Sequence, residues 1–409
     1  MGNPEKWIIK YVGPNMMIKK IYIIWTERLN VQRGGVHRVI YILMRHLPKY
    51  GHEVHYLYTE DAYQTFHLYN DDERNEKIIS LSEMRQFLVD NRCDLLIGQD
   101  GGCSSRLSEL VAEWHISDMK YVTEYHNSIL LMERTFSRHY WKWLAQQSET
   151  SLRTKALARV RLIMYPLWLI HCRRAVLDNF LANYRVANAL VLLSKHEIPE
   201  IQKLTDMDLA RCKVINNPLS WEKIEGEQIL DGKKKQVLIV SRLYNPEKRL
   251  DRAMKIWKIL AKRGLTDWQL IIVGAGVHEA YLKTLSCEPG LKNVVFTGRQ
   301  APYPYYRDAA LFMMTSAVEG WGLTLTESMQ TGVVPIAFDS YPALHDIITD
   351  RYDGCIIPDD DLEAYANCME ELMCNPEERE RIARNGLVSC RRFEINIIVE
   401  QWATLIESL

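Results

Sequence analysis

The fold of the second half of the chain follows from one stretch, Leu311-Phe-Met-Met-Thr-Ser-Ala-Val-Glu-Gly-Trp-Gly-Leu-Thr-Leu-Thr-Glu327. Its first four residues form an apolar run that is typical of a strand buried on both faces of a sheet. A loop with two glycines comes next, and the following residues predict a helix that reaches Gln330 and ends at Gly332. A strand, a loop and a helix in this order form the repeating unit of a parallel α/β domain.

The same alternation of short strands and helices extends in both directions from this stretch. It predicts strands in the second half at 237–240, 269–273, 294–297 and 333–337, and in the first half at 18–25, 54–58, 95–98, 121–124 and 189–193. The polar stretch 216–235 separates the two series. We therefore expect an α/β protein with two Rossmann-like domains that face a cleft, in which ligands bind beyond the carboxyl ends of the strands.

The domain boundaries follow from the same pattern. We expect an N-terminal domain over residues 17–220, a second domain over 221–390, and a C-terminal helix over 391–409 that packs back on the first domain. Within the first domain, the segment 130–186 is mostly helical in pattern and rich in aromatic and basic side chains. Residues 1–15 precede the first strand and are expected to add nothing to the fold.

Composition and charge exclude several classes of protein. The 409 residues are 47% hydrophobic and 25% charged, which is ordinary for a globular chain. With 51 Lys and Arg against 52 Asp and Glu, no overall field attracts nucleic acid, and we expect none as a partner. The first 220 residues hold 29 basic and 24 acidic side chains, so an anionic surface would meet the first half.

Cysteine usage and the apolar runs predict a cytoplasmic protein. The nine cysteines include no C-x-x-C pair, and a chain of this length does not need disulfides. Residues 1–10 lack the apolar core of a secretory signal. The longest apolar run, 162–170, contains Pro166 and is far shorter than the roughly 20 residues of a membrane span. We expect membrane contact, if any, to be peripheral and on the inner face.

The helix that begins near Leu323 predicts an anion site. Gly320 and Gly322 flank its start, where free backbone N–H groups and the positive end of the helix dipole suit a phosphate. Glu319 and Glu327 lie on either side of this start and would repel a phosphate. The two carboxylates are therefore better explained as acceptors for sugar or ribose hydroxyls.

A second cluster, Ser241-Arg-Leu-Tyr-Asn-Pro-Glu-Lys248, follows the first strand of the second domain. Arg242 and Lys248 leave the carboxyl edge of the sheet there, where they can converge on an anion. Together with the glycine-flanked helix start, they predict a diphosphate as the ligand.

These residues belong to an ordered set of motifs, and with it the chain resembles the retaining GT-B glycosyltransferases of family 4, which use nucleotide-sugar donors. The resemblance extends from about Met17 to the C-terminus and is strongest in the Glu-x7-Glu signature at Glu319 and Glu327. The other matching motifs are Gly34-Gly-Val-His-Arg38, Glu124-Tyr-His126, Val191-Leu-Leu-Ser194, Val214-Ile-Asn-Asn-Pro218, Ser241-Arg-Leu with Lys248, Ile272-Val-Gly-Ala-Gly276, Val294-Val-Phe-Thr-Gly298, Thr331-Gly-Val-Val-Pro335 and Asp353-Gly354. One departure is Asp339-Ser-Tyr-Pro-Ala343, which is bulkier and more polar than the Gly-rich turn of many relatives.

The resemblance implies a role for each matched residue. Arg242 and Lys248 would bind the donor diphosphate and stabilise the leaving group, and Glu327 would accept hydrogen bonds from the ribose. Glu319 and, from the first domain, His126 would contact the donor sugar, so that the implied catalytic residues are Glu319, Arg242, Lys248 and His126. A lone histidine after a strand is equally typical of a packing residue. The implied donor-binding residues are Gly34, Gly35, Arg242, Lys248, Glu319, Gly320, Trp321, Gly322, Leu323 and Glu327.

The resemblance also implies an activity. The chain would transfer a hexosyl group with retention from a nucleotide-diphosphate-sugar to a saccharide or a lipid-linked saccharide, in polysaccharide or glycan assembly. It would need no metal and no cofactor, and a UDP-sugar is the default donor on family frequency alone. Two alternatives stay open: a nucleotide-sugar-binding protein without turnover, and a GT-B sugar-nucleotide epimerase.

Two other patterns have simpler explanations than ligand binding. Gly274-Ala-Gly276 lacks the third glycine of a dinucleotide fingerprint, because Glu279 occupies that position, and a tight strand-to-helix turn is expected. Asp359-Asp-Asp361 contains an Asp-x-Asp but precedes a helical pattern, so we expect helix capping.

The segment 134–174 is open to two interpretations. It holds nine Lys or Arg against one Glu, with Trp141, Trp143, Tyr165 and Trp168 among them. A basic amphipathic helix with aromatic residues is typical of a membrane-surface element. The alternative is an ordinary helical subdomain that covers the acceptor site, with its basic residues in solvent.

Overall fold

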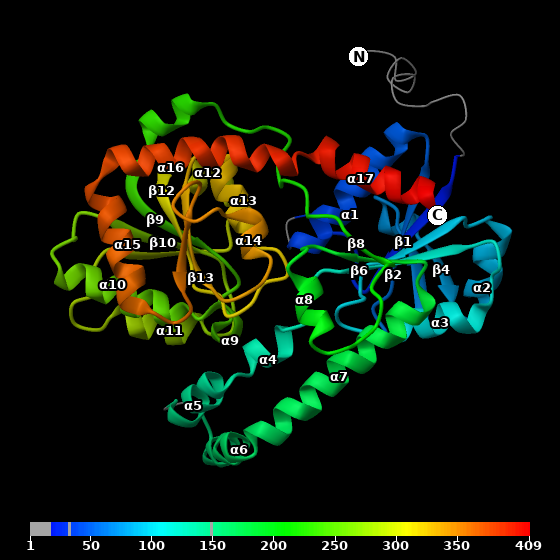
Figure 1. Ribbon diagram of the computed structural model, residues 1–409, viewed down its shortest axis with the longest axis horizontal. Helices are drawn as coiled ribbons and strands as arrows, with labels where there is room; N and C mark the ends of the chain where they lie inside the picture. Colours follow the sequence, from blue (N-terminus) through cyan, green and yellow to red (C-terminus); the bar gives the residue numbers. More distant parts are fainter. Residues whose placement is uncertain (1–17, 32–33, 148–149) are drawn as a thin grey trace. The chain divides into compact units, whose positions relative to one another are not determined.

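The computed structural model describes residues 18–31, 34–147 and 150–409, which divide into two compact units (Figure 1). Of the described residues, the first unit comprises 18–31, 34–129, 174–218 and 393–409, and the second comprises 130–147, 150–173 and 219–392. The sequence pattern predicts that 130–186 belongs to the first domain, whereas in the structure this segment belongs to the second unit as far as Arg173. Residues 1–15 and Met17 lie outside the described residues.

The first unit is built on an eight-stranded sheet in the order β4-β3-β2-β1-β5-β6-β7-β8. Its strands pair in parallel except β3, which is antiparallel to both of its neighbours. Strands β3, β4 and β8 were not predicted. The strands are β1 (Lys20–Trp25), β2 (Glu53–Tyr58), β3 (Thr65–Leu68), β4 (Lys77–Ser80), β5 (Leu95–Gly98), β6 (Lys120–Tyr125), β7 (Ala189–Leu192) and β8 (Cys212–Val214).

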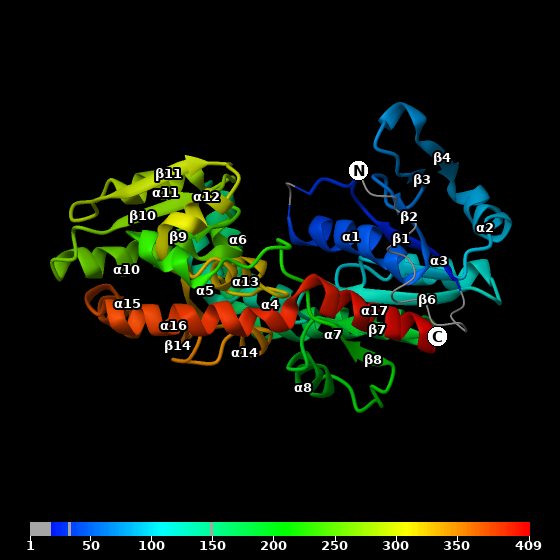
Figure 2. The ribbon, with the colours of Figure 1, turned by 90° about the horizontal axis from the view of Figure 1, so that it is seen from above.

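Helices pack on the sheet of the first unit, and the buried side chains between them form two apolar clusters. One cluster joins the sheet to α1 (Gly35–His46) and α17 (Ile395–Ser408), which lie side by side (Figure 2). Trp402 of α17 is fully buried there, so this helix is part of the core of the first unit. The second cluster includes residues of α2 (Leu81–Asp90), α3 (Arg106–Trp114) and the end of α7 (Tyr165–Val186). The first unit also contains the short helices α8 (Glu197–Gln202), η3 (Leu47–Tyr50) and η4 (Glu73–Asn75).

The second unit has a six-stranded, wholly parallel sheet in the order β11-β10-β9-β12-β13-β14. The strand order reverses between β9 and β12, which is where doubly wound sheets bind ligands. The strands are β9 (Lys234–Val240), β10 (Gln269–Val273), β11 (Val294–Gly298), β12 (Ala309–Met314), β13 (Val334–Asp339) and β14 (Cys355–Pro358).

A single apolar core holds this sheet between its helices. Trp257 from α10 (Leu250–Lys262) and Tyr365 from α15 (Leu362–Cys374) are among its largest side chains. As expected from the sequence, Asp361 caps α15, with its side chain accepting from Ala364 N. The other helices are α9 (Asn245–Lys248), α11 (Glu279–Ser286), α12 (Tyr303–Asp308), α13 (Leu323–Gln330), α14 (Leu344–Ile347), α16 (Pro376–Ser389), η5 (Glu227–Gly232) and η6 (Cys390–Phe393).

A helical segment with α4 (Leu131–Thr135), α5 (Arg138–Gln146), α6 (Leu152–Ile163) and the first half of α7 completes the second unit. Trp143 anchors it to α11, because its indole N–H donates to the hydroxyl of Tyr281 at 3.1 Å and its ring packs on His278. This contact explains why the segment groups with the second unit.

Candidate functional site

The loop after β9 is held by two glycines from the loop after β10. A Cβ atom on Gly274, whose φ is +146°, would lie 1.8 Å from the carbonyl oxygen of Ser241, and one on Gly276 would lie 2.5 Å from that of Leu243. The two loops instead pair through Ser241 N to Val273 O and Leu243 N to Ala275 O, both at 3.0 Å. Backbone packing therefore requires both glycines, and it places the loop that carries Arg242.

Lys248 and Glu319 meet where the loops after β9 and β12 converge. The ammonium of Lys248 donates to Oε1 of Glu319 at 2.6 Å, and the hydroxyl of Ser316 donates to the same oxygen at 2.6 Å. The two charged side chains are largely buried, with 15% and 17% of their surface exposed. Thr315 Oγ1 also donates to the carbonyl of Lys248 at 2.8 Å. A cation and a carboxylate are thus paired at the switch point of the sheet.

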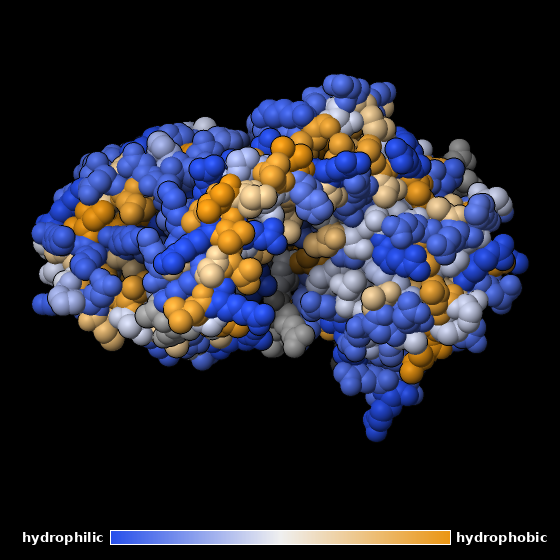
Figure 3. Space-filling view, turned by 90° about the horizontal axis from the view of Figure 1, so that it is seen from below, coloured by the Kyte–Doolittle hydropathy of each residue, from blue (hydrophilic) through white to orange (hydrophobic). Residues whose placement is uncertain are grey.

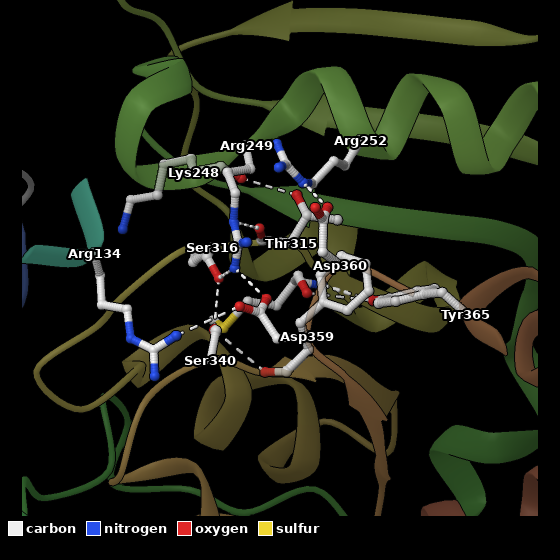
Figure 4. A network of polar contacts seen from close by, with 12 residues as sticks. Arg134, Lys248, Arg249, Arg252, Thr315, Ser316, Ser340, Asp359, Asp360 and Tyr365 are labelled. Atoms are coloured by element: carbon white, nitrogen blue, oxygen red, sulfur yellow. Dashed lines mark hydrogen bonds and ion pairs between the residues drawn. The ribbon is translucent and has the colours of Figure 1, made fainter. Parts of the chain in front are cut away.

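Arg249, the residue after Lys248, binds the loop after β12 (Figure 4). Its backbone is left-handed, with φ at 46°, and its guanidinium donates to the carbonyls of Thr315 at 3.2 Å and Ser316 at 2.8 Å. It also donates to Asp359 at 2.7 Å. The pKa of Arg249 is lowered by burial, an effect that Asp359 opposes. One buried side chain therefore ties the loop after β12 to the turn after α9.

The neighbouring acids have structural partners. Asp360 accepts from the buried Arg252, and Arg134 of the helical segment lies 3.6 Å from Asp359 (Figure 4). The Asp-x-Asp sequence thus pairs with arginines and caps α15, in line with its simpler explanation.

Arg242 is on the same loop, but within the described residues its side chain is engaged away from Lys248 and Glu319. Instead, its guanidinium donates to Glu247 at 2.6 Å and lies over the ring of Tyr244. Its side chain is 64% exposed and can reorient.

The amino end of α13 forms the other side of the site. Gly322 precedes Leu323 with φ at 98°, and a Cβ atom there would lie 2.8 Å from the hydroxyl of Tyr341. The first turn of α13 contains no acidic residue, so its N–H groups face no carboxylate of their own helix. Burial, together with the charge of Glu319, raises the pKa of Tyr341.

The remaining predicted residues of the second unit are placed around this helix. Gly320 and Trp321 form the loop before it, and the indole of Trp321 is buried. Glu327 lies within α13, is buried, and accepts from the hydroxyl of Ser220 at 2.6 Å.

In the first unit, Gly34 and Gly35 mark the start of α1 after β1, and His126 follows β6. Nε2 of His126 lies 2.5 Å from Oε1 of Gln99 and 3.7 Å from Oε2 of Glu124. Burial lowers the pKa of His126 to about 3 and raises that of Glu124 to about 8. The histidine is thus a neutral, packed side chain at the carboxyl edge of the first sheet.

Sequence reasoning missed several residues that shape these sites. Arg249 is adjacent to the predicted Lys248, yet no spacing rule shows that Arg249 binds the loop after β12 while Lys248 pairs with Glu319. Ser316 and Glu247 lie inside motifs in which only other residues were predicted to bind the ligand. Gln99 follows β5, and the shared edge of parallel strands was the signal that could have found it.

The described residues contain neither a cluster of metal-ligating side chains nor a helix that could span a membrane. Within 18–31, 34–147 and 150–409, no group of three or more His, Cys, Asp or Glu side chains is placed to hold a metal ion. In the same ranges, no helix has the length and hydropathy needed to cross a bilayer.

The second unit is similar to a known family of proteins. Residues 221–388 match the family model of the glycosyl transferases group 1. This group 1 region contains β9 to α16 and therefore every predicted site residue of the second unit. An uncharacterized glycosyltransferase of Haemophilus influenzae is 28% identical over 170 residues, which are 41% of this chain and 48% of the relative. The chain thus spans about half the length of that relative.

A second relative and a solved structure extend the comparison. The Campylobacter jejuni GalNAc-alpha-(1->4)-GalNAc-alpha-(1->3)-diNAcBac-PP-undecaprenol alpha-1,4-N-acetyl-D-galactosaminyltransferase is 29% identical over 198 residues, or 48% of this chain and 54% of the relative. The crystal structure of Anabaena HepE in complex with UDP superposes with a TM-score of 0.66 over 96% of this chain and 100% of HepE, at 15% identity. The predicted GT-B fold class, with two α/β units, is confirmed.

Proposed function

We propose that this chain is a retaining glycosyltransferase of family 4 that moves a hexosyl group from a nucleotide-diphosphate-sugar to a saccharide or lipid-linked acceptor. The observation that carries the proposal is the ion pair of Lys248 and Glu319 beside the amino end of α13, at the switch point of the second sheet. The match of residues 221–388 to the group 1 family supports it.

In this proposal, the donor diphosphate lies between Lys248 and the N–H groups of Gly322 and Leu323. Departure of the nucleotide leaves negative charge on the diphosphate, and fixed cations and a helix dipole stabilise that charge as it develops. Arg242 joins them by exchanging Glu247 for the diphosphate, which its exposed side chain permits. No metal and no cofactor is required for this role.

The two glutamates then bind the neutral parts of the donor. Glu319 accepts from hydroxyls of the sugar once Lys248 turns to the diphosphate, and Glu327 accepts from the ribose in place of Ser220. Gly34 and Gly35 let the loop after β1 approach the donor, and His126 contacts the sugar as a neutral imidazole. A UDP-sugar is the preferred donor, since HepE, which shares the fold, binds UDP.

The acceptor is proposed from the relatives. The Campylobacter relative acts on a saccharide linked to undecaprenyl diphosphate, which supports a lipid-linked saccharide here and a place in polysaccharide assembly on the inner face of the membrane. The two alternatives, a binding protein without turnover and an epimerase, are less favoured because the matched relatives are transferases.

Thermal shift with UDP, GDP, ADP and their sugar conjugates tests the donor site. We expect one nucleotide to raise the melting temperature of the wild type and to have a much smaller effect on Lys248→Ala and Arg242→Ala. Lys262→Ala is the matched control, because Lys262 is exposed at the far end of α10. A full set of shifts in Lys248→Ala would contradict the proposal.

Product analysis separates the proposed transfer from its alternatives. With the stabilising donor and a polyprenyl-linked saccharide, a transferase releases the nucleoside diphosphate and extends the acceptor, and the new linkage keeps the anomeric configuration of the donor. An epimerase instead consumes the donor without any acceptor, and a binding protein leaves both substrates intact.

A further inference from the structure

The outer side of α6 is apolar, although it faces solvent. Ala158 is buried and Leu162 is half-buried, and together they mark the side of α6 that packs on the rest of the second unit. Aliphatic side chains on the opposite side continue into the first half of α7, and a band of apolar side chains crosses the face of the molecule on which these helices lie (Figure 3). This apolar strip consists of Leu152, Leu157, Val160, Ile163, Met164, Leu167 and Ile170, which are 44–85% exposed.

Basic side chains border the strip. Helix α6 contains four basic residues and no acidic one. Helical periodicity places Lys155 and Arg159, one turn apart, along one edge of the strip and Arg161 along the other. Arg153 lies at the start of the strip and is exposed. An apolar band flanked by cations is the arrangement by which interfacial helices lie on anionic membranes.

The aromatic residues of the segment are not part of this surface. Trp141 packs against Phe136 and Trp168, with ring centroids 6.0 and 6.5 Å apart, and Trp168 packs against Tyr165 at 5.5 Å. Trp143 is bound to Tyr281. The aromatic rings therefore pack against one another within the helical subdomain, whereas the aliphatic side chains of the strip stay exposed to solvent.

We propose that the apolar strip docks on an anionic lipid bilayer, with its aliphatic side chains among the acyl chains near the head groups and its basic residues on the lipid phosphates. Charge complementarity favours this occupant over a second copy of the chain, because two strips facing each other would bring their rows of cations together. The proposal goes beyond the proposed function and does not depend on it, since it requires no nucleotide or acceptor.

Vesicle flotation of the full chain tests the proposal. Vesicles of equal parts phosphatidylcholine and phosphatidylglycerol are compared with phosphatidylcholine alone, in the absence of nucleotide. We expect the wild type to float with the mixed vesicles only, and less so at high salt. The double variant Val160→Asp/Ile163→Asp should reduce the bound fraction about tenfold or more, and Arg153→Glu/Arg159→Glu should also reduce it. Val388→Asp should float like the wild type, because Val388 is similarly exposed but lies on α16.

Three results would overturn the proposal. The wild type could stay at the bottom of the gradient with the mixed vesicles, or Val160→Asp/Ile163→Asp could float as well as the wild type. Light scattering could also show a dimer that the same double variant converts to a monomer, with no vesicle binding, which would assign the strip to a second copy. Melting temperatures of the variants show that they are folded, and the nucleotide thermal shift, performed without lipid, reports separately on the proposed function.

Discussion

Lys248 and Glu319 are 71 residues apart in the sequence, yet the ammonium of one donates to the carboxylate of the other at 2.6 Å. Without ligand, the cation proposed for the donor diphosphate is neutralised by the acid proposed for the donor sugar. In the proposed function, donor binding breaks this pair, and each residue then acts on a different part of the donor.

The variant Glu319→Gln separates these two roles. Removing the carboxylate frees Lys248, so we expect the affinity for the nucleoside diphosphate to rise about threefold to tenfold. We expect transfer from the intact donor to fall about tenfold to a hundredfold, because a charged hydrogen bond to the sugar is lost. Calorimetric titration with the diphosphate and initial rates of transfer measure the two effects. Weaker diphosphate binding in this variant would show that the ion pair does not compete with the donor.

Arg249 should be important for stability rather than for chemistry. The variant Arg249→Ala removes the buried guanidinium that donates to Asp359 and to the carbonyls of Thr315 and Ser316, and we expect the free energy of unfolding to fall by about 2–4 kcal/mol. The control Arg263→Ala removes an arginine that pairs with exposed acids on α15, and we expect a loss of less than about 1 kcal/mol. Urea denaturation of both variants checks this, and equal losses would count against a special role for Arg249.

Gly322 should resist substitution for two physical reasons. An alanine there has to adopt φ near 98° and also place its Cβ atom 2.8 Å from the hydroxyl of Tyr341. The control Gly264→Ala has a similar φ of 89° but no atom within 4 Å of the new Cβ. We expect Gly264→Ala to cost about 1 kcal/mol and Gly322→Ala clearly more. Adding Tyr341→Phe to Gly322→Ala should recover part of the difference, and no recovery would mean that the contact with the hydroxyl is not the cause.

Glu124 should make stability depend on pH. Burial raises the pKa of Glu124 from 4.5 to about 8, so the native state favours the protonated acid. This contribution to stability is complete below about pH 4.5 and is lost as the pH rises through about 8, at about 1.4 kcal/mol for each unit of pKa difference. Relative to Glu124→Gln, the wild type should therefore become less stable between about pH 5 and pH 8. Urea denaturation of both proteins across this range measures the difference, in which the contribution of His126 cancels to first order. A constant difference would contradict the assignment.

Sequence alone predicted the strands that are buried on both faces. The run 237–240 within β9 and the run 311–314 within β12 are wholly apolar, and this pattern is typical of the interior of a parallel sheet. It missed β3 and β4, because each has only two apolar residues among four and only one side chain that is fully buried. The predicted site residues of the second unit are grouped around β9, β12 and α13, because those motifs follow strands whose carboxyl ends share one edge.

The sequence by itself therefore determined the succession of buried strands along the chain and the loops that carry polar residues. It also determined which side chains are available at one edge of each sheet. Only the tertiary structure decided that Lys248 pairs with Glu319 and that Arg249, one residue later, is buried under the loop instead. It also decided that the aromatics of 134–174 pack inward and leave an aliphatic strip outside. The local sequence pattern indicates whether a residue lies in a strand, a helix or a loop. Ion pairing and the burial of a side chain, in contrast, depend on contacts between residues that are far apart in the chain.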